Sequence, residues 1–264
     1  AAAAGTTIHL IDQDGTPDVL CTGYDADEVA WYANTAGDGS SWTKTTIGTG
    51  LNGALATQLA DLDADGDLDA VVGVDTGDEL VWFENTDGVG GTWAGTVIDA
   101  AINDPGDLDT RDVDQDGDLD IVIAATDGDE TALYENDGGS FTKWIIQGNF
   151  NGATGAATND LDGDGDIDVV TTAIYDDDVV MLRNDTIHSS SQGFTETDLG
   201  GVLDNPRHTT IVDVDGDGDL DVLGGGNNGL AILENLNGDA SAWQETFGDT
   251  SGYWATGAAD LDDD

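Results

Sequence analysis

Short hydrophobic runs separated by polar turns recur along this chain, and the same order of runs returns five times. In each unit a short segment, such as 54–60 or 209–214, leads into an Asp-rich loop, and an apolar run follows the loop. Short apolar runs bounded by Gly, Asp and Asn are typical of β-strands rather than helices. These apolar runs are residues 17–23, 68–74, 119–125, 167–173 and 220–226.

Two further runs complete each unit. The first of them always ends with an Asn, and Asn is typical of turns. It comprises residues 28–34, 79–85, 131–136, 179–184 and 230–235. After a stretch rich in Gly, Ser and Asp comes the last run, at residues 41–47, 92–98, 140–146, 193–199 and 242–247. Together with the segment that leads into the loop, each unit is predicted to hold four strands.

The spacing of the units predicts the fold. The Asp-rich loops begin at intervals of 47 to 53 residues, at Leu10, Asp61, Asp112, Asp160, Asp213 and Asp260. Four short antiparallel strands per repeat of this length predict an all-β fold, a β-propeller of four-stranded blades. We expect a single domain over 1–264, with units of approximately 1–50, 51–101, 102–149, 150–202 and 203–249 and a partial sixth at 250–264.

The partial sixth unit leaves two architectures open. The chain is either a fragment of a larger propeller of about six to eight blades or a ring of five units with a spare strand. In both, one blade cannot cover both faces of its own sheet, so stacking of blade on blade supplies the core.

Large aromatic residues at matching positions of the units indicate where the blades pack. Packing between blades is the favoured role for them, and a platform for stacking sugars is the alternative. Trp31, Trp82 and Tyr134 lie in predicted third strands, and fourth strands open with Trp42, Trp93, Phe141, Phe194 and Trp243.

Four of the loops carry the full pattern Asp-x-Asp-x-Asp-Gly-x-x-Asp. Calcium prefers about six to eight oxygen ligands, which carboxylates at positions 1, 3, 5 and 9 and the backbone carbonyl of position 7 can supply around a Gly turn. The side-chain sets are Asp61, Asp63, Asp65 and Asp69; Asp112, Asp114, Asp116 and Asp120; Asp160, Asp162, Asp164 and Asp168; Asp213, Asp215, Asp217 and Asp221. The carbonyl positions are Asp67, Asp118, Asp166 and Asp219. Because clustered carboxylates repel one another unless a cation neutralises them, the sequence predicts four calcium sites.

Two loops are incomplete. The loop at 10–18 keeps Asp12, Asp14 and Asp18 but has Leu10 in first position, so we expect a weaker fifth site or none. The sixth retains only Asp260, Asp262 and Asp264 and lacks the Gly and the last ligand. Magnesium is less suited to these loops, and zinc or copper would need His or Cys ligands. The histidines, His9, His188 and His208, share no metal-site spacing and are interpreted as surface or turn residues.

Charge narrows the range of partners. The chain has 56 Asp and Glu against 5 Lys and Arg, a formal net charge of −51, which excludes nucleic acid and anionic membrane surfaces as partners. Cys21 stands alone, so no disulfide can form within the chain and bound ions would replace it as a staple. No apolar run reaches the ~20 residues of a membrane span, so we expect no membrane insertion.

The loops, joined to strands such as "LVWFEN" at 80–85, resemble those of the FG-GAP and VCBS repeat family, the integrin alpha-chain type of calcium-binding β-propeller. The resemblance extends over nearly the whole chain. It implies that the loop links the first two strands of a blade, that its metal stiffens the blade edge, and that other loops hold ligands.

The chain contains no nucleophile elbow, Cys/His pair, phosphate-binding Gly loop or zinc signature, so we expect no catalysis. The favoured function is a non-catalytic calcium-binding propeller, extracellular, secreted or at the cell surface, for adhesion or for binding a glycan or protein ligand. One alternative is a structural subunit that assembles with neighbouring subunits into a cell-surface or filamentous structure. Another is an accessory propeller of a polysaccharide-active enzyme.

Overall fold

The structure is a computed structural model that describes residues 3–185, 193–200, 203–249, 251–253 and 256–257. Within these ranges the chain forms twenty β-strands and one 3-10 helix of three residues, η1 (Tyr24–Ala26). The prediction of an all-β fold is therefore confirmed. None of the helical structure in these ranges has the length and hydrophobicity to cross a bilayer.

The strands fall into four classes by their place in the repeat. The first strands are β1 (Ala3–His9), β5 (Ala54–Ala60), β9 (Pro105–Arg111), β13 (Ala153–Asn159) and β17 (His208–Val212). The second strands are β2 (Asp18–Gly23), β6 (Asp69–Val74), β10 (Asp120–Ala125), β14 (Asp168–Ala173) and β18 (Asp221–Gly226). The third strands are β3 (Glu28–Ala33), β7 (Glu79–Asn85), β11 (Glu130–Asn136), β15 (Asp178–Asn184) and β19 (Gly229–Asn235). The fourth strands are β4 (Thr43–Thr49), β8 (Trp93–Asp99), β12 (Phe141–Gly148), β16 (Phe194–Asp198) and β20 (Trp243–Asp249).

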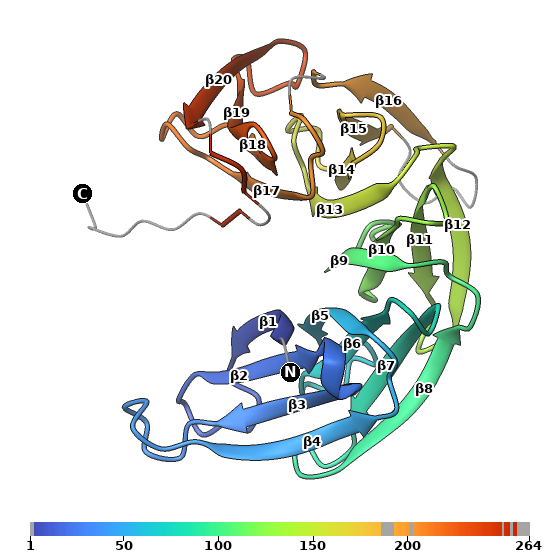
Figure 1. The fold of residues 1–264 in the computed structure, drawn as a ribbon, viewed down its shortest axis with the longest axis vertical. Helices are drawn as coiled ribbons and strands as arrows, with labels where there is room; N and C mark the ends of the chain where they lie inside the picture. The colour runs from blue at the N-terminus through green and yellow to red at the C-terminus, as the bar shows by residue number, and fades with distance from the viewer. Residues whose placement is uncertain (1–2, 186–192, 201–202, 250, 254–255, 258–264) are drawn as a thin grey trace.

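Each unit folds into one four-stranded sheet in which sequence neighbours pair antiparallel. The five sheets follow one another around an open arc, with the first strand of each innermost and the fourth outermost (Figure 1). This arrangement of blades is that of a β-propeller, as the repeat spacing predicts. The sixth loop, with Asp260, Asp262 and Asp264, lies outside the described residues.

The hairpins between second and third strands share one backbone device. In the first four blades the residue just before the third strand has a left-handed backbone, with φ between 52° and 59° at Asp27, Asp78, Asp129 and Asp177. Asp is among the few residues with a side chain that adopt this conformation readily, because its carboxylate can hydrogen-bond locally. The Asp content of the chain therefore serves its turns as well as its loops.

The hydrophobic core lies between the blades. The described residues form four buried clusters, each of which joins one blade to the next. In β6, β10, β14 and β18 every residue is buried. Neighbouring blades cover both faces of the first three, whereas Tyr253 and Thr256 pack against β18 at Gly225. The strand β2, in the first blade of the arc, alternates between buried and half-buried positions instead.

The aromatic residues follow this packing with one exception. Trp31, Trp82 and Tyr134 are buried, and Trp93 packs at the edge of the cluster between the first two blades, as predicted. Trp42 is 43% exposed, so the prediction of packing is wrong for this residue. Trp93 of the second blade packs toward the first blade. Trp42 is the equivalent residue of the first blade, and no described blade lies on that side of it.

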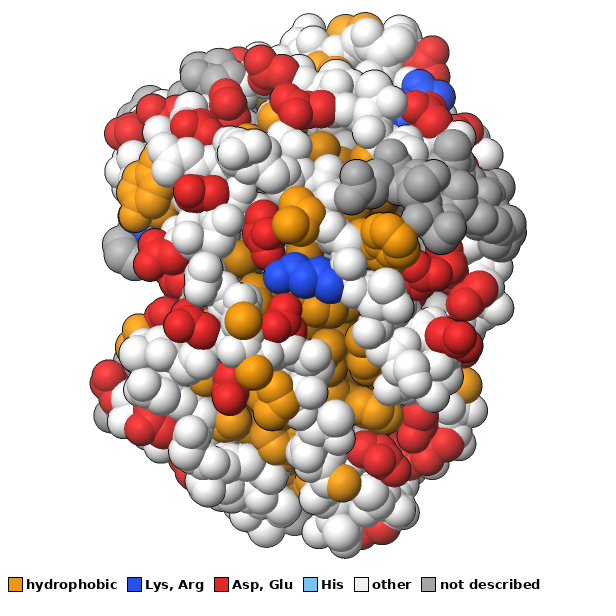
Figure 2. All heavy atoms as spheres, turned by 90° about the vertical axis from the view of Figure 1, so that its right-hand side faces the viewer, with side chains coloured by type: hydrophobic (Ala, Val, Ile, Leu, Met, Phe, Trp, Pro, Cys, Tyr) orange, Lys and Arg blue, Asp and Glu red, His pale blue; other side chains and the backbone are white. Residues whose placement is uncertain are grey.

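The outer side of the arc is polar and acidic. Asp and Glu side chains are spread around a band of hydrophobic side chains on this side, and few Lys or Arg side chains are visible (Figure 2). Lys143 of β12 bridges two blades here, with Nζ 3.2 Å from Asp99 Oδ2 of β8 and 2.8 Å from Glu130 Oε1 of its own blade. Lys143 thus links the second and third blades through ion pairs.

Candidate metal centre

The Asp-rich loops connect the first strand of each blade to the second. Because all blades repeat the same strand order and direction, the five described loops lie at the same face of the arc. The second to fifth loops, at 61–68, 112–119, 160–167 and 213–220, carry the full pattern of carboxylates.

The loop backbone turns at two positions rather than one. Position 6 is Gly in every described loop, with φ between 89° and 108°, as the sequence predicts. A Cβ atom added at Gly66 or Gly117 would meet nothing within 4 Å, so the requirement for Gly is one of backbone conformation and not of space. Position 4 is also left-handed, even where it is not Gly, with φ of 59° at Ala64 and 60° at Gln115.

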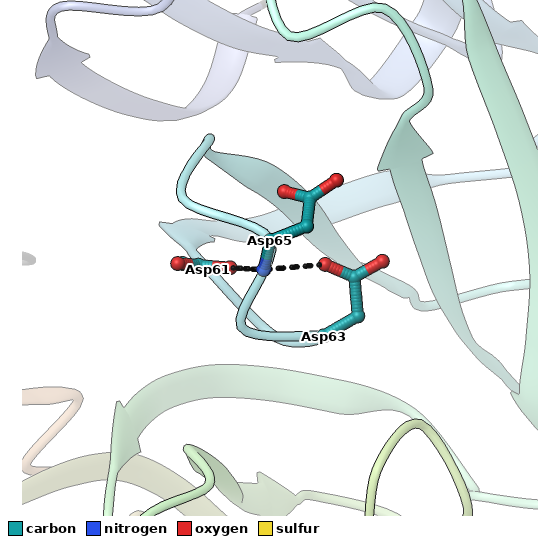
Figure 3. Close-up of side chains that lie close together, drawn as sticks. All are labelled: Asp61, Asp63 and Asp65. Carbon is teal, nitrogen blue, oxygen red and sulfur yellow. Dashed lines mark hydrogen bonds between the residues drawn. The ribbon is translucent and has the colours of Figure 1, made fainter.

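The turn directs the carboxylates toward one another and toward backbone N–H groups. In the second loop the Asp65 N–H donates to Asp61 Oδ1 at 3.1 Å and lies 3.3 Å from Asp63 Oδ1. Figure 3 shows the Asp61 and Asp63 carboxylates on either side of that nitrogen, with the Asp65 carboxylate nearby. The N–H of Gly66 donates to Asp61 Oδ2 at 3.0 Å.

The structure brings together three carboxylates in each complete loop. One oxygen from each member lies within 4.8 Å of the others in the groups Asp61, Asp63 and Asp65; Asp112, Asp114 and Asp120; Asp160, Asp162 and Asp168; Asp213, Asp215 and Asp221. Positions 1 and 3 belong to every group. Position 5 completes the group in the second loop and position 9 in the other three.

The Asp at position 9 is a buried anchor. In the third blade Asp120 is 0% exposed, its Oδ2 accepts the Val113 N–H at 2.8 Å and its Oδ1 accepts the Asn136 N–H at 2.9 Å. The other described blades repeat both bonds. Burial raises the pKa of Asp69 to about 6 and those of Asp120 and Asp168 to about 7.

Several carboxylate oxygens in the loops are buried without a hydrogen-bond partner among the described residues: Asp67 Oδ1, Asp112 Oδ1 and Asp160 Oδ1. Burial first, and then the charges of Asp65 and Asp69, raise the pKa of Asp67 to about 7. Buried, unpaired anionic oxygens are costly unless a cation is coordinated. The donor set is oxygen alone, so these loops fit a hard divalent cation such as Ca²⁺.

The first loop differs, as Leu10 in first position suggests. Leu10 is 48% exposed, and Asp12, Asp14 and Asp18 do not meet in a group of three within the described part of the chain. Asp14 accepts the Thr16 N–H at 2.7 Å and the Thr16 hydroxyl at 2.6 Å instead. Asp18 keeps the anchoring role of position 9, with its Oδ2 3.1 Å from the Ile11 nitrogen.

The sequence interpretation missed the role of the Asn that closes each third strand. Asn136 is 0% exposed, and its Oδ1 accepts the Gly139 N–H at 2.8 Å. Its Nδ2 donates to Leu119 O at 3.0 Å in its own loop and to Leu62 O at 2.8 Å in the loop of the preceding blade. Asn184 and Asn235 make the same contact with the preceding loop, through Val113 O and Leu161 O. The available signal was the recurrence of Asn 16 residues after the last loop Asp in four blades and 14 residues after it in the fifth.

Fold and site together define the class as a β-propeller whose blades carry acidic loops between their first two strands. The chain belongs to the FG-GAP-like repeat family, since the model of that repeat matches residues 11–72, 112–171 and 160–224, more than half of the chain. A comparison with curated proteins finds no match.

Solved structures share the fold at low sequence identity. An Agrocybe aegerita lectin, described as recognising non-reducing terminal N-acetylglucosamine, is 21% identical with a TM-score of 0.60, over 93% of this chain and 66% of the lectin chain. The WD40 β-propeller domain of Doa1 is 12% identical with a TM-score of 0.61, over 94% and 70%. A chain of a nidogen/laminin complex is 11% identical with a TM-score of 0.61, over 96% and 83%. This chain thus spans about two thirds of the lectin's length.

Proposed function

We propose that this chain is a non-catalytic, calcium-binding β-propeller of an extracellular, secreted or cell-surface protein, which presents a rigid surface to a glycan or protein ligand. The observation that carries the proposal is the convergence of three carboxylates within 4.8 Å in each of four loops. A bound calcium ion accounts for the oxygen-only donor set, for the buried carboxylate oxygens without a hydrogen-bond partner, and for the recurrence of the same loop in four blades. Extracellular calcium modules bind with dissociation constants of about 10⁻⁴–10⁻³ M, which weak, partly exposed loops can reach.

The residues assign a role to each part of the loop. Carboxylates at positions 1, 3, 5 and 9 would hold the ion, together with the carbonyl of position 7, and the ion would supply the positive charge that the loop lacks. The position 9 Asp also ties the loop to the third strand through its closing Asn. Ion binding would therefore stiffen the blade and fix the surface on which a ligand docks.

A ligand-binding role is supported by the kinds of partner that propellers of this fold engage, which include the sugar named for the fungal lectin and the laminin named with nidogen. Sequence identities of 21% and 11% support a shared fold but not a shared ligand, so a ligand for this chain is part of the proposal.

A second role, assembly with neighbouring subunits, is favoured by the first blade. Ile8 is 64% exposed, Leu10 48% and Trp42 43%, so this blade presents hydrophobic side chains that the described residues leave uncovered. Such a surface suits contact with another protein chain.

Calcium titration after exhaustive chelation tests the proposal. We expect about four ions per chain by calorimetry and equilibrium dialysis, and a melting temperature that falls strongly in excess chelator. Magnesium at the same concentration should restore less of the lost stability. Metal analysis without bound calcium, together with melting that does not respond to chelator, would overturn the proposal.

A further inference from the structure

A polar cavity lies on the inner side of the arc, apart from the acidic loops. Its volume is about 320 Å³, and it is lined by the first strands β9, β13 and β17 with Gln58 of β5 beside them. These strands face the centre of the arc (Figure 1). Ligand pockets commonly begin at about 300 Å³, so the cavity can accept a small molecule.

Two acidic residues of β9 line this cavity. Asp109 is held in place, because its Oδ2 accepts the Thr158 N–H at 2.9 Å and the Thr158 hydroxyl at 2.7 Å. Asp107 also accepts two backbone N–H groups, from Leu108 at 3.0 Å to Oδ1 and from Ala156 at 3.4 Å to Oδ2. Its Oδ2 faces His208 Nε2 at 3.7 Å, which is too long for a direct hydrogen bond.

His208 is oriented from its other side. The backbone nitrogen of Thr256 lies 3.3 Å from His208 Nδ1 and the Thr256 hydroxyl 3.0 Å, so Nδ1 faces Thr256 and Nε2 faces Asp107. His208 begins the strand β17 and its side chain is 31% exposed, so it is a strand residue at the surface of the cavity. Burial raises the pKa of Asp107 to about 6, and the charge of a protonated His208 limits the rise.

The lining also offers a hydrogen-bond donor. The Arg111 guanidinium lines the cavity and donates to Thr158 O at 3.3 Å. The Oγ1 of Thr209 has no hydrogen-bond partner among the described residues, but it is closed to solvent, so a molecule in the cavity does not reach it.

We infer that this cavity binds a small neutral polyhydroxylated molecule of about the size of one sugar ring. The carboxylates of Asp107 and Asp109 only accept hydrogen bonds and repel anions, whereas the Arg111 guanidinium only donates hydrogen bonds. A hydroxyl group both donates and accepts, so a polyol can satisfy the two kinds of lining group at once. Leu108 and Ile211, which also line the cavity, suit the C–H face of a sugar ring.

This inference rests on the proposed binding function, but not on calcium. The acidic loops can hold their ions whether or not the cavity is occupied, and the cavity lies on strands whose backbone is fixed by the sheets. Calcium content and sugar binding are therefore measured on the same samples, so that the failure of one proposal is distinguished from the failure of the other.

The test uses the calcium-loaded full chain with glucose, galactose, mannose and N-acetylglucosamine as probes, followed by saturation-transfer NMR and calorimetry. We expect at least one of them to bind with little change between 0.1 and 1 M NaCl, since a neutral ligand is not screened (about 10 to 3 Å screening lengths). The anionic analogue glucuronate should bind about tenfold more weakly.

Two variants assign the site. Asp107→Asn should weaken sugar binding about tenfold, and Arg111→Gln, which removes the guanidinium from the lining, should also weaken it. The exposed Asp127→Asn outside the cavity is the matched control and should bind as the parent does. The inference is overturned if no neutral sugar binds at 0.1 M NaCl, if glucuronate binds more tightly than the neutral sugars, or if both variants bind as well as the control.

Discussion

The Arg183 side chain reaches into the fourth acidic loop, with its Nε 2.8 Å from Asp162 Oδ2. The guanidinium also lies 3.7 Å from Asp164 Oδ2, so it contacts the carboxylates of positions 3 and 5. The equivalent residues of the neighbouring blades, next to the closing Asn, are Glu135 and Glu234. Among the complete loops, the fourth therefore has a positively charged side chain among its carboxylates.

This relationship predicts that the fourth loop binds calcium more weakly than the others. Replacing the arginine by Arg183→Ala should raise the affinity of one site by about three- to tenfold, since an exposed ion pair contributes up to about 1 kcal/mol. Equilibrium dialysis over a series of free calcium concentrations measures the effect. Lys44→Ala makes the same change in net charge far from any complete loop and should leave binding unchanged. Identical isotherms for Arg183→Ala and the parent would contradict the prediction.

Loss of a position 5 carboxylate should cost one ion. We expect Asp65→Ala to bind about one calcium fewer than the parent and to melt at a lower temperature in calcium. In chelator the two proteins should melt alike, because the stabilisation by mass action, about 2.7 kcal/mol per site at a hundredfold excess of ligand, is absent from both. Retention of the full complement of ions would show that Asp65 is not a ligand.

Loss of a position 9 carboxylate should lower the free energy of unfolding even in the absence of calcium. Asp120→Ala removes the acceptor of the Val113 and Asn136 N–H groups, which lie at 2.8 and 2.9 Å from its oxygens. Two buried donors without acceptors cost about 2–4 kcal/mol, measurable by urea unfolding in excess chelator at pH 8. Asp116→Ala, in the same loop, is the control and should unfold like the parent in chelator. Equal stabilities of the two variants would exclude the anchoring role.

The closing Asn should be as important as the loop itself. Asn136→Ala removes the bonds from Nδ2 to Leu62 O and Leu119 O and leaves the Gly139 N–H without its acceptor. We expect a loss of about 2–3 kcal/mol in the free energy of unfolding. The exposed Asn237→Ala should change the stability by less than about 0.5 kcal/mol. A similar effect of both substitutions would contradict the role of Asn136 as a link between blades.

A carboxylate pair away from the metal loops should make stability depend on pH. Burial, and then the hydrogen bond and charge of Asp75, raise the pKa of Asp104 to about 7. Because this value lies above that of an unfolded Asp, about 3.9, ionisation costs stability that is fully present at pH 4 and lost as the pH rises through about 7. Asp104→Asn should therefore stabilise the protein at pH 8, by about 1–2 kcal/mol after allowance for solvent screening, and leave it unchanged at pH 4.

Urea unfolding of both proteins in chelator at the two pH values measures this difference. The left-handed backbone of Asp104, with φ of 51°, accepts Asn without strain, so the substitution tests charge alone. An equal effect at pH 4 and pH 8 would show that the carboxylate of Asp104 titrates as in the unfolded chain.

Strand order and blade architecture were predictable because the four strands and the loop of each blade come from one continuous stretch of sequence. The exposure of Trp42 was not, since the same residue type is covered in one blade and uncovered in another according to what packs beside it. Local pattern also gave the convergence of positions 1 and 3 in the acidic loops. It did not distinguish position 9, because only the fold reveals that Asp120 holds two backbone groups while it faces the loop.

The inner cavity escaped sequence analysis for a different reason. Asp107 and His208 belong to different blades, and neither lies at a position that the repeat marks. They meet because the arc brings the first strands around a common centre. Spacing along one repeat cannot indicate such a meeting.

The side chains of Asn136, Asn184 and Asn235 each bind the loop of the preceding blade, so four successive blades are linked at their acidic loops. Leu62 O in the second blade is held by the third, Val113 O in the third by the fourth, and Leu161 O in the fourth by the fifth. A hydrogen bond couples both of its partners, so local opening of one loop weakens the next blade, and opening of that blade weakens the loop. Opening at one acidic loop therefore spreads along the arc as a cooperative event and does not stay within one blade.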